Sequence, residues 1–139
     1  MSAFVLDSSV ALSWVFEDEF SAYSDFVVAR FDDSEVHVPS LWWLEVANCL
    51  VLAERKGRLD TESLARALEE VGALSVRDDP WIPSRMGAVT RVAQEFGLTC
   101  YEALYLELAL RLEMPLATLD RQLAEAAQSV GRFLAPPGS

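Results

Sequence analysis

Short apolar runs alternate with longer helix-like segments along the whole chain, and this alternation constrains the fold more than any other feature. The run at residues 3–6, Ala-Phe-Val-Leu, is continuously apolar, as in strands that are buried on both faces of a parallel sheet. Helical patterns follow these runs, in the order typical of βα units. The sequence therefore predicts an α/β protein with a mainly parallel sheet of four to five strands.

The expected elements follow from the same pattern. We expect strands at residues 3–6, 35–38, 73–76 and 115–119, with an edge strand at 131–134. We expect helices from Asp7-Ser8-Ser9 to about residue 15, at 20–31, at 41–56 with Ser40 as its cap, at 60–72, at 83–96, at 100–113, and from Asp120 onward. No repeat or linker divides the chain, so residues 1–134 are expected to form one domain and 135–139 a loose tail.

Composition limits the class of protein. Hydrophobic residues make up 52% of the 139 residues, which argues against disorder, yet no apolar run is long enough to span a bilayer. The N-terminal MSAFVLDSS does not resemble a secretory signal. Cys49 and Cys100 lie in apolar helical patterns, so we expect small core residues in a reducing cytosol rather than a disulfide.

Four acids stand in apolar stretches without a basic residue three or four positions away: Asp7, Glu45, Glu102 and Asp120. Most other acids fall in polar runs, where exposure to solvent explains them. A carboxylate in apolar surroundings is costly unless it is paired, hydrogen-bonded or bound to a metal. Several carboxylates meeting at one place repel one another, and a hard divalent cation relieves that repulsion. We therefore expect a metal site made of carboxylates alone.

The predicted topology gives these acids a common place. Ligands of doubly wound sheets bind beyond the carboxyl ends of the strands, where helices begin. Asp7 and Asp120 each follow an expected strand and open a helix. Glu102 lies in the first turn of its helix, and Glu45 lies in the second turn of the long helix.

Helix capping is an alternative explanation for three of the acids. Asp is a favoured N-cap, so capping and metal binding are equally good interpretations of Asp7 and Asp120. Thr99-Cys100-Tyr101-Glu102 has the pattern of a capping box, which favours a cap for Glu102 taken alone. Glu45 has no cap role and carries the most weight. The hypothesis rests on the consistent placement of all four.

Several chemistries are excluded by what the sequence lacks. His37 is the only histidine and lies in an expected strand, which excludes a histidine pair or a Ser-His-Asp triad. One histidine and two separated cysteines do not form a standard zinc site, and no glycine-rich nucleotide loop is present. The net charge of −11, from 22 acids and 11 bases, argues against a nucleic-acid binder. Without the four acids, 18 acids against 11 bases still leave −7.

Four segments carry a family resemblance: FVLDSSVAL at 4–12, PSLWWLEVAN at 39–48, GLTCYEALYL at 97–106 and PLATLD at 115–120. Their order and spacing resemble those of PIN-domain ribonucleases, specifically the VapC toxins of bacterial toxin–antitoxin modules. The resemblance extends over essentially the whole chain.

The resemblance implies a three-layer α/β/α sandwich, a homodimer, and a cytoplasmic endoribonuclease that depends on Mg²⁺ or Mn²⁺. A cognate antitoxin would hold it inactive, with its C-terminal segment over the site. The family's acidic ligands fall on Asp7, Glu45, Glu102 and Asp120. Its polar supports fall on Ser9 and Thr118. Glu102 would hold a second ion or orient water, and the other three acids would hold the catalytic ion.

One departure from the family supports an alternative. The family usually has Asp at the position of Glu102. This departure and the net charge favour a catalytically weak or inactive PIN-fold module that binds a partner; a further alternative is an RNA-maturation nuclease without an antitoxin. The sequence suggests four arginines for phosphate contacts: Arg85, Arg91, Arg111 and Arg121. One of the adjacent Trp42 and Trp43 is expected at a partner or dimer surface.

Overall fold

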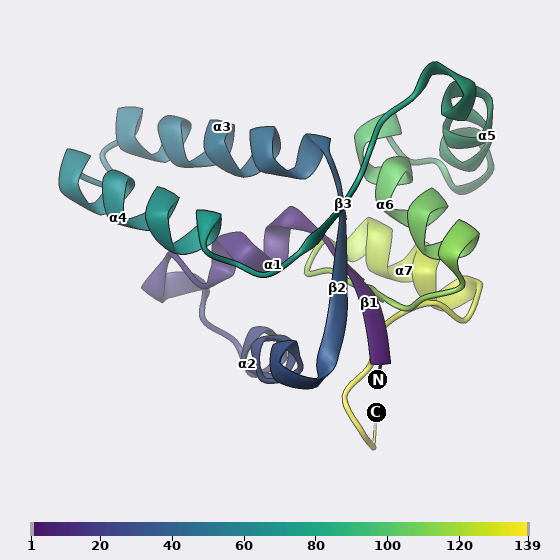
Figure 1. Ribbon diagram of the computed structural model, residues 1–139, viewed down its shortest axis with the longest axis horizontal. Coiled ribbons are helices and arrows are strands. Elements are labelled where there is room, and N and C mark those ends of the chain that lie inside the picture. Colours follow the sequence, from purple (N-terminus) through teal and green to yellow (C-terminus); the bar gives the residue numbers. More distant parts are fainter. Residues whose placement is uncertain (1, 139) are drawn as a thin grey trace.

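The computed structural model describes residues 2–138, in which a parallel sheet carries helices on both faces (Figure 1). The strands are β1 (Ser2–Leu6), β2 (Ser34–Pro39), β3 (Arg77–Asp79) and β4 (Leu116–Ala117). They lie in the order β3-β2-β1-β4, and all three pairings are parallel. The predicted parallel sheet is confirmed.

The helices form the two outer layers (Figure 1). One side carries α1 (Ser8–Ser13), α2 (Ala22–Ala29), α3 (Leu41–Arg55) and α4 (Thr61–Gly72). The other side carries α5 (Met86–Phe96), α6 (Cys100–Leu112) and α7 (Arg121–Ser129). Three short 3-10 turns complete the chain at Glu17–Glu19, Phe31–Asp33 and Pro83–Arg85. The expected three-layer sandwich is thereby confirmed. Within the described part of the chain, no helix is long and apolar enough to span a bilayer.

The core is centred on β1 and α6. Phe4, Val5 and Leu6 are fully buried, as expected for a strand that has neighbours on both edges and helices on both faces. The stretch of α6 from 103 to 109 is buried throughout, because this helix contacts the sheet as well as α5 and α7. Trp42 of α3 is also fully buried. Asp7 directly follows β1 and Glu102 lies in the first turn of α6, so both acids are attached to elements of this core.

The third strand lies later in the sequence than expected. The expectation was residues 73–76, but Ala73 ends α4 in helical geometry, and the ladder with β2 begins only at Arg77. Arg77 and Asp78 are exposed, so this edge strand lacks the apolar run that marks a buried one. The shift reflects an edge position, where charged side chains face solvent.

Three smaller expectations are also corrected. Ser40 has helical backbone angles and does not cap α3; its hydroxyl accepts a hydrogen bond from Trp81 N at 3.2 Å. Cys49 and Cys100 are unpaired as expected, but both are exposed rather than part of the core. The expected edge strand at 131–134 is reduced to one parallel bridge between Leu116 and Phe133.

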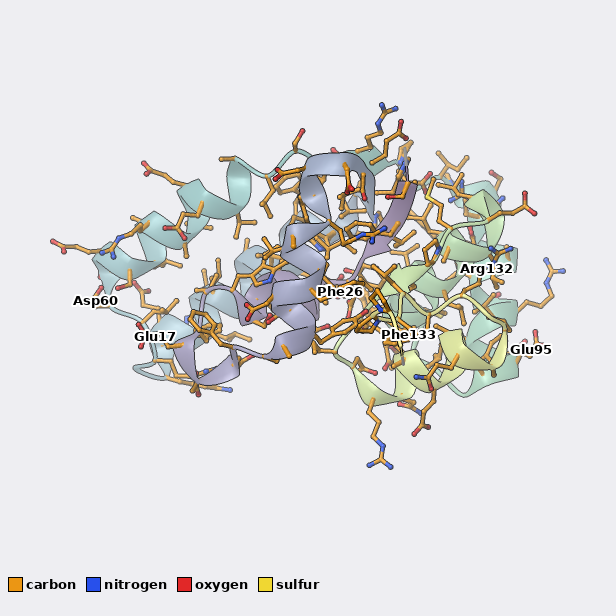
Figure 2. The ribbon with its side chains drawn as sticks, turned by 90° about the horizontal axis from the view of Figure 1, so that it is seen from below. Glu17, Phe26, Asp60, Glu95, Arg132 and Phe133 are labelled. Carbon is orange, nitrogen blue, oxygen red and sulfur yellow. The ribbon has the colours of Figure 1, made fainter. Side chains whose placement is uncertain are left out.

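The segment that follows α7 packs against α2. The Phe133 ring stacks on Tyr23 at 5.5 Å between ring centroids, and the Tyr23 hydroxyl donates to the Leu134 carbonyl oxygen at 2.8 Å. The Tyr23 ring also lies 6.1 Å from the ring of Phe26, and Phe26 and Phe133 are labelled near the centre of Figure 2. These contacts bring the last part of the chain back to its first quarter.

A cluster of ion pairs joins α6 to the end of β3. Glu107 is only 5% exposed, and its Oε1 accepts hydrogen bonds from Arg85 at 2.7 Å and from Arg111 at 3.0 Å. Arg111 also donates to Asp79 at 2.7 Å. The backbone N–H of Ser40 donates to the Asp79 carbonyl oxygen at 2.9 Å, so the cluster also fixes the start of α3. Two of the four arginines suggested for phosphate contacts are thus engaged within the fold.

Candidate active site

The Asp7 carboxylate lies directly after β1 and is 6% exposed. Its Oδ2 accepts hydrogen bonds from the hydroxyls of Ser9 at 2.6 Å and Thr118 at 2.7 Å. Among residues 2–138, Oδ1 receives only a long contact from the Ser8 hydroxyl at 3.5 Å. Burial raises the pKa of Asp7, the Ser9 and Thr118 hydrogen bonds lower it, and the charge of Asp120 raises it. Asp7 makes no side-chain capping hydrogen bond to α1. The capping interpretation is therefore wrong for this residue.

The two hydroxyls that hold Asp7 connect the loops after β1 and β4. Ser9 Oγ accepts from the backbone N–H of Leu119 at 2.9 Å, and Thr118 Oγ1 accepts from the backbone N–H of Asp120 at 3.0 Å. Because an ionised carboxylate only accepts hydrogen bonds, each hydroxyl directs its own hydrogen to Asp7 while its oxygen accepts from the backbone. Both hydroxyls thus act as donors that fix the orientation of Asp7.

Asp120 and Glu102 do cap their helices. Asp120 Oδ1 accepts from Leu123 N at 2.8 Å at the start of α7. Glu102 Oε1 accepts from Thr99 N at 2.9 Å while the Thr99 hydroxyl accepts from Glu102 N at 3.1 Å, which completes the predicted capping box. In both acids the second carboxylate oxygen has no hydrogen bond from residues 2–138. Capping therefore occupies one oxygen and leaves the other available.

Glu45 is held by a tyrosine from the opposite layer. Its Oε1 accepts a short hydrogen bond from the hydroxyl of Tyr105, a fully buried residue of α6. Burial raises the pKa of Glu45, the Tyr105 hydrogen bond lowers it, and the charge of Asp7 raises it. Burial and the charges of Asp7 and Glu45 also raise the pKa of Tyr105, so this hydroxyl keeps its proton and remains a donor.

All four acids line one hollow of about 210 Å³, together with Ser8, Ser9, Leu12, Tyr101, Tyr105 and Leu123. No lysine, arginine or histidine is among these lining residues. Each acid has one oxygen held by a short protein hydrogen bond, and the other oxygen lacks one within residues 2–138. The hollow therefore presents several partly satisfied carboxylates without a compensating positive charge.

The donor set fits a hard cation that keeps part of its water. No three His, Cys, Asp or Glu side chains of the described chain stand close enough to hold one ion as a group. Mg²⁺ usually takes one or two carboxylates and completes its shell with water, so direct contact with three acids is not required. Water in the hollow would bridge the ion to the remaining carboxylates.

Tyr105 belongs to this site but was not predicted from the sequence. The sequence contains one indication of its role, because a tyrosine in the apolar stretch of α6 needs a hydrogen-bond partner for its hydroxyl once it is buried. The identity of the partner depends on the packing of α6 against α3, which no local pattern reveals. Among the suggested arginines, Arg121 follows Asp120 but is exposed and forms an ion pair with Glu125 at 3.3 Å.

Comparison with known proteins identifies the family. The family model of the PIN domain matches residues 4–129. The chain belongs to the PIN-domain family. It is 33% identical over 125 residues to Ribonuclease VapC3 of Pyrobaculum aerophilum, covering 87% of this chain and 92% of that relative.

Two solved structures resemble this PIN domain. The crystal structure of PAE2754 from Pyrobaculum aerophilum matches with a TM-score of 0.68 and 27% identity, covering 90% of this chain and 79% of that one. The structure of VapBC2 from Rickettsia felis, bound to a DNA fragment from their promoter, matches with a TM-score of 0.63 and 6% identity, covering 95% and 96%. The second likeness concerns the fold alone. The resemblance to PIN domains expected from the sequence is confirmed.

Proposed function

We propose that this PIN-domain protein is an endoribonuclease toxin of the VapC type that depends on Mg²⁺ or Mn²⁺ and is restrained by a cognate antitoxin. One observation carries the proposal: four acids line a single hollow, and each has an oxygen that lacks a short protein hydrogen bond. The 33% identity to Ribonuclease VapC3 over nearly its whole length supports RNA as the substrate.

The acids have different roles in this proposal. Asp7, Glu45 and Asp120 would hold the cation, and Glu102 would hold a second ion or orient the attacking water. When bound, the cation polarises the phosphate and lowers the pKa of water. Water attacks the phosphorus from the side opposite the 3′ oxygen. The bond between the phosphorus and the 3′ oxygen breaks, which leaves a 5′-phosphate and a 3′-hydroxyl.

The neighbours of the acids would position them for this reaction. Ser9 and Thr118 hold one oxygen of Asp7 and leave Oδ1 for the cation. Tyr105 does the same for Glu45. Groups that orient metal ligands in this way typically affect metal affinity or activity about 10- to 100-fold. Leu12 and Leu123 line the same hollow and would limit the amount of water that surrounds the bound substrate.

Cleavage of a labelled RNA in Mg²⁺ or Mn²⁺ tests the proposal. Wild type is expected to cleave, Asp7→Asn is expected to lose cleavage, and EDTA is expected to abolish cleavage by wild type. Asp32→Asn is a matched control, because Asp32 is an exposed acid outside the hollow. Equal cleavage by wild type and Asp7→Asn, or cleavage that persists in EDTA, would overturn the proposal.

The proposed partners are an antitoxin and a second copy of the chain. Large apolar side chains are exposed after β3, at Trp81, Ile82 and Met86, and they offer a surface for a homodimer. Light scattering of wild type and Met86→Asp is expected to show a dimer and a monomer, respectively. Coexpression with the product of a neighbouring small gene is expected to give a complex without RNA cleavage.

The exposed, unpaired thiols of Cys49 and Cys100 fit a reducing cytosol.

A catalytically inactive interaction module is the second candidate. It is favoured by the capping role of Glu102 and by the absence, within residues 2–138, of three acids close enough to hold an ion together. Calorimetry with Mn²⁺ separates the two candidates. An inactive module binds Mn²⁺ no better than its Asp7→Asn variant, whereas the proposed nuclease binds it more tightly.

A further inference from the structure

A second and larger hollow adjoins the acid-lined one. It measures about 420 Å³ and is lined by Leu41, Leu44, Glu45, Asn48 and Tyr101. The first four residues recur at helical spacing and form one face of α3, while Tyr101 comes from the first turn of α6. Glu45 and Tyr101 line both hollows, so the two lie side by side. A ligand whose reacting group lies among the acids would extend directly into this second space.

The walls of the second hollow are apolar, aromatic and exposed. Leu44 is 68% exposed and Tyr101 is 65% exposed. Among residues 2–138, Tyr101 has no aromatic partner, and neither its hydroxyl nor the Asn48 amide makes a hydrogen bond. The hollow thus combines an open aromatic ring, two leucines and an amide that can both donate and accept. Such a mixture binds a flat ligand with polar edges.

Charge decides which part of an RNA could bind here. The chain carries −11, and the acids beside this hollow repel phosphate. Arg85 and Arg111 are engaged by carboxylates of the fold, and Arg58 is engaged by Asp18 and Glu19. No lysine, arginine or histidine of the described chain lines either hollow, so phosphate contacts within them are a weak source of affinity. Nucleobases are uncharged, and they bind to aromatic and apolar surfaces by stacking.

We propose that the second hollow binds an unpaired nucleobase next to the cleaved phosphodiester, with the base stacked on Tyr101 and its edge hydrogen-bonded by Asn48. This inference rests on the proposed function, because the RNA backbone places a base beside the reacting phosphate. Leu41 and Leu44 cover the remainder of the base. A base that is paired in a duplex cannot enter, so the site selects single-stranded or looped RNA.

Cleavage of a short single-stranded RNA by the full chain in Mn²⁺ tests the inference. Stacking of one base on an aromatic ring corresponds to about a 5- to 150-fold effect when the ring is removed. Tyr101→Ala is expected to lower kcat/KM by this factor, mainly through KM, and Tyr101→Phe is expected to retain the wild-type value. Phe20→Ala is the matched control, because Phe20 is an exposed aromatic residue that lines neither hollow.

A set of RNAs with a single abasic nucleotide gives a readout that needs no variant. Cleavage by wild type is expected to fall by a similar factor when the abasic nucleotide is at one position beside the cleaved bond, and Tyr101→Ala is expected to be insensitive to that change. Asn48→Ala is expected to reduce the preference among the four bases at that position. If Tyr101→Ala does not respond to the abasic nucleotide and Asn48→Ala has a weaker preference among the four bases, the second hollow is the binding site of that base.

The outcomes distinguish this inference from the proposed function. If wild type cleaves no RNA, both are overturned. If wild type cleaves and Tyr101→Ala matches it with every abasic RNA, the nucleobase site is overturned and the nuclease stands. If Tyr101→Ala cleaves as wild type does but escapes inhibition by the antitoxin, the hollow is a protein contact and the nucleobase site is likewise overturned.

Discussion

Replacing Asp7 by Asn separates the cost of a buried charge from the role of that charge in holding a cation. Asn has the same shape, and its carbonyl oxygen can accept the hydroxyl hydrogen bonds from Ser9 and Thr118. Its amide nitrogen then takes the place of Oδ1, which has the long contact with the Ser8 hydroxyl. This nitrogen is a donor in a hollow whose other walls carry three carboxylates. In the metal-free protein, the substitution removes a desolvated charge and keeps the hydrogen bonds.

The expected magnitude follows from two opposing effects. Burying an ionised group costs several kcal/mol, or about 4 kcal/mol for one carboxylate. A hydrogen bond to a charged group contributes about 1 kcal/mol more than one between neutral groups, so the two hydroxyls together lose about 2 kcal/mol. Asp7→Asn is therefore expected to stabilise the metal-free protein by about 2 kcal/mol at pH 7. For a chain of this size, the melting temperature rises by about 6 °C.

The gain depends on pH in a defined direction. Burial raises the pKa of Asp7, so the folded wild type takes up a proton at a pH at which the unfolded chain is still ionised. Wild type therefore regains stability as the pH falls through the raised pKa. The advantage of Asp7→Asn should be complete above the raised pKa of Asp7 and should disappear towards the unfolded value of about 3.9.

Scanning calorimetry in EDTA between pH 4.5 and 8 measures this difference. Asp32→Asn removes the same charge from an exposed position and is expected to change stability by less than about 0.5 kcal/mol. Addition of Mn²⁺ is expected to stabilise wild type and to leave Asp7→Asn unchanged. A lower melting temperature for Asp7→Asn than for wild type in EDTA at pH 7 would refute the reasoning.

Three further substitutions test the surroundings of the site. Tyr105→Phe removes the hydrogen-bond donor to Glu45 and is expected to weaken Mn²⁺ binding about 10- to 100-fold in calorimetry. An unchanged affinity would contradict the role of Tyr105 in orienting Glu45. Glu102→Gln keeps an oxygen for Thr99 N, so stability should change by less than about 0.5 kcal/mol while Mn²⁺ binding weakens; intact binding would leave Glu102 with the capping role alone. Glu107→Gln leaves partly buried Arg85 without its carboxylate partner and leaves Arg111 with Asp79, and it is expected to lower the free energy of unfolding by about 2 kcal/mol in urea. The same change at exposed Glu125 should have almost no effect.

The parts of the fold that the sequence predicted well are those with strong local signals. The apolar run of β1, the capping box at Thr99 and the N-cap at Asp120 are determined by neighbouring residues. The edge strand β3 was misplaced because its residues are charged and its position depends on pairing with β2. Ser40 was misread as a cap because its hydroxyl is used by Trp81, which lies in a different segment.

The acids of the site were found from their apolar surroundings, but the groups that orient them depend on tertiary packing. Two carboxylate oxygens are held by local donors, those of Glu102 and Asp120. The Tyr105 donor to Glu45 lies 60 residues away, and the Thr118 donor to Asp7 lies 111 residues away. Local patterns therefore determine which oxygen remains free in Glu102 and Asp120, whereas in Asp7 and Glu45 this also depends on how the layers pack.

The pair of hydroxyls at Ser9 and Thr118 has a consequence for the order of events during synthesis. The first strand leaves the ribosome early, but the hydroxyl and backbone groups that complete its carboxylate belong to the last quarter of the chain. A nascent polypeptide that ends before Thr118 has Asp7 without this partner and lacks Asp120 entirely. The acidic centre therefore cannot form until translation has passed Asp120 and the loop after β4 has reached the end of β1.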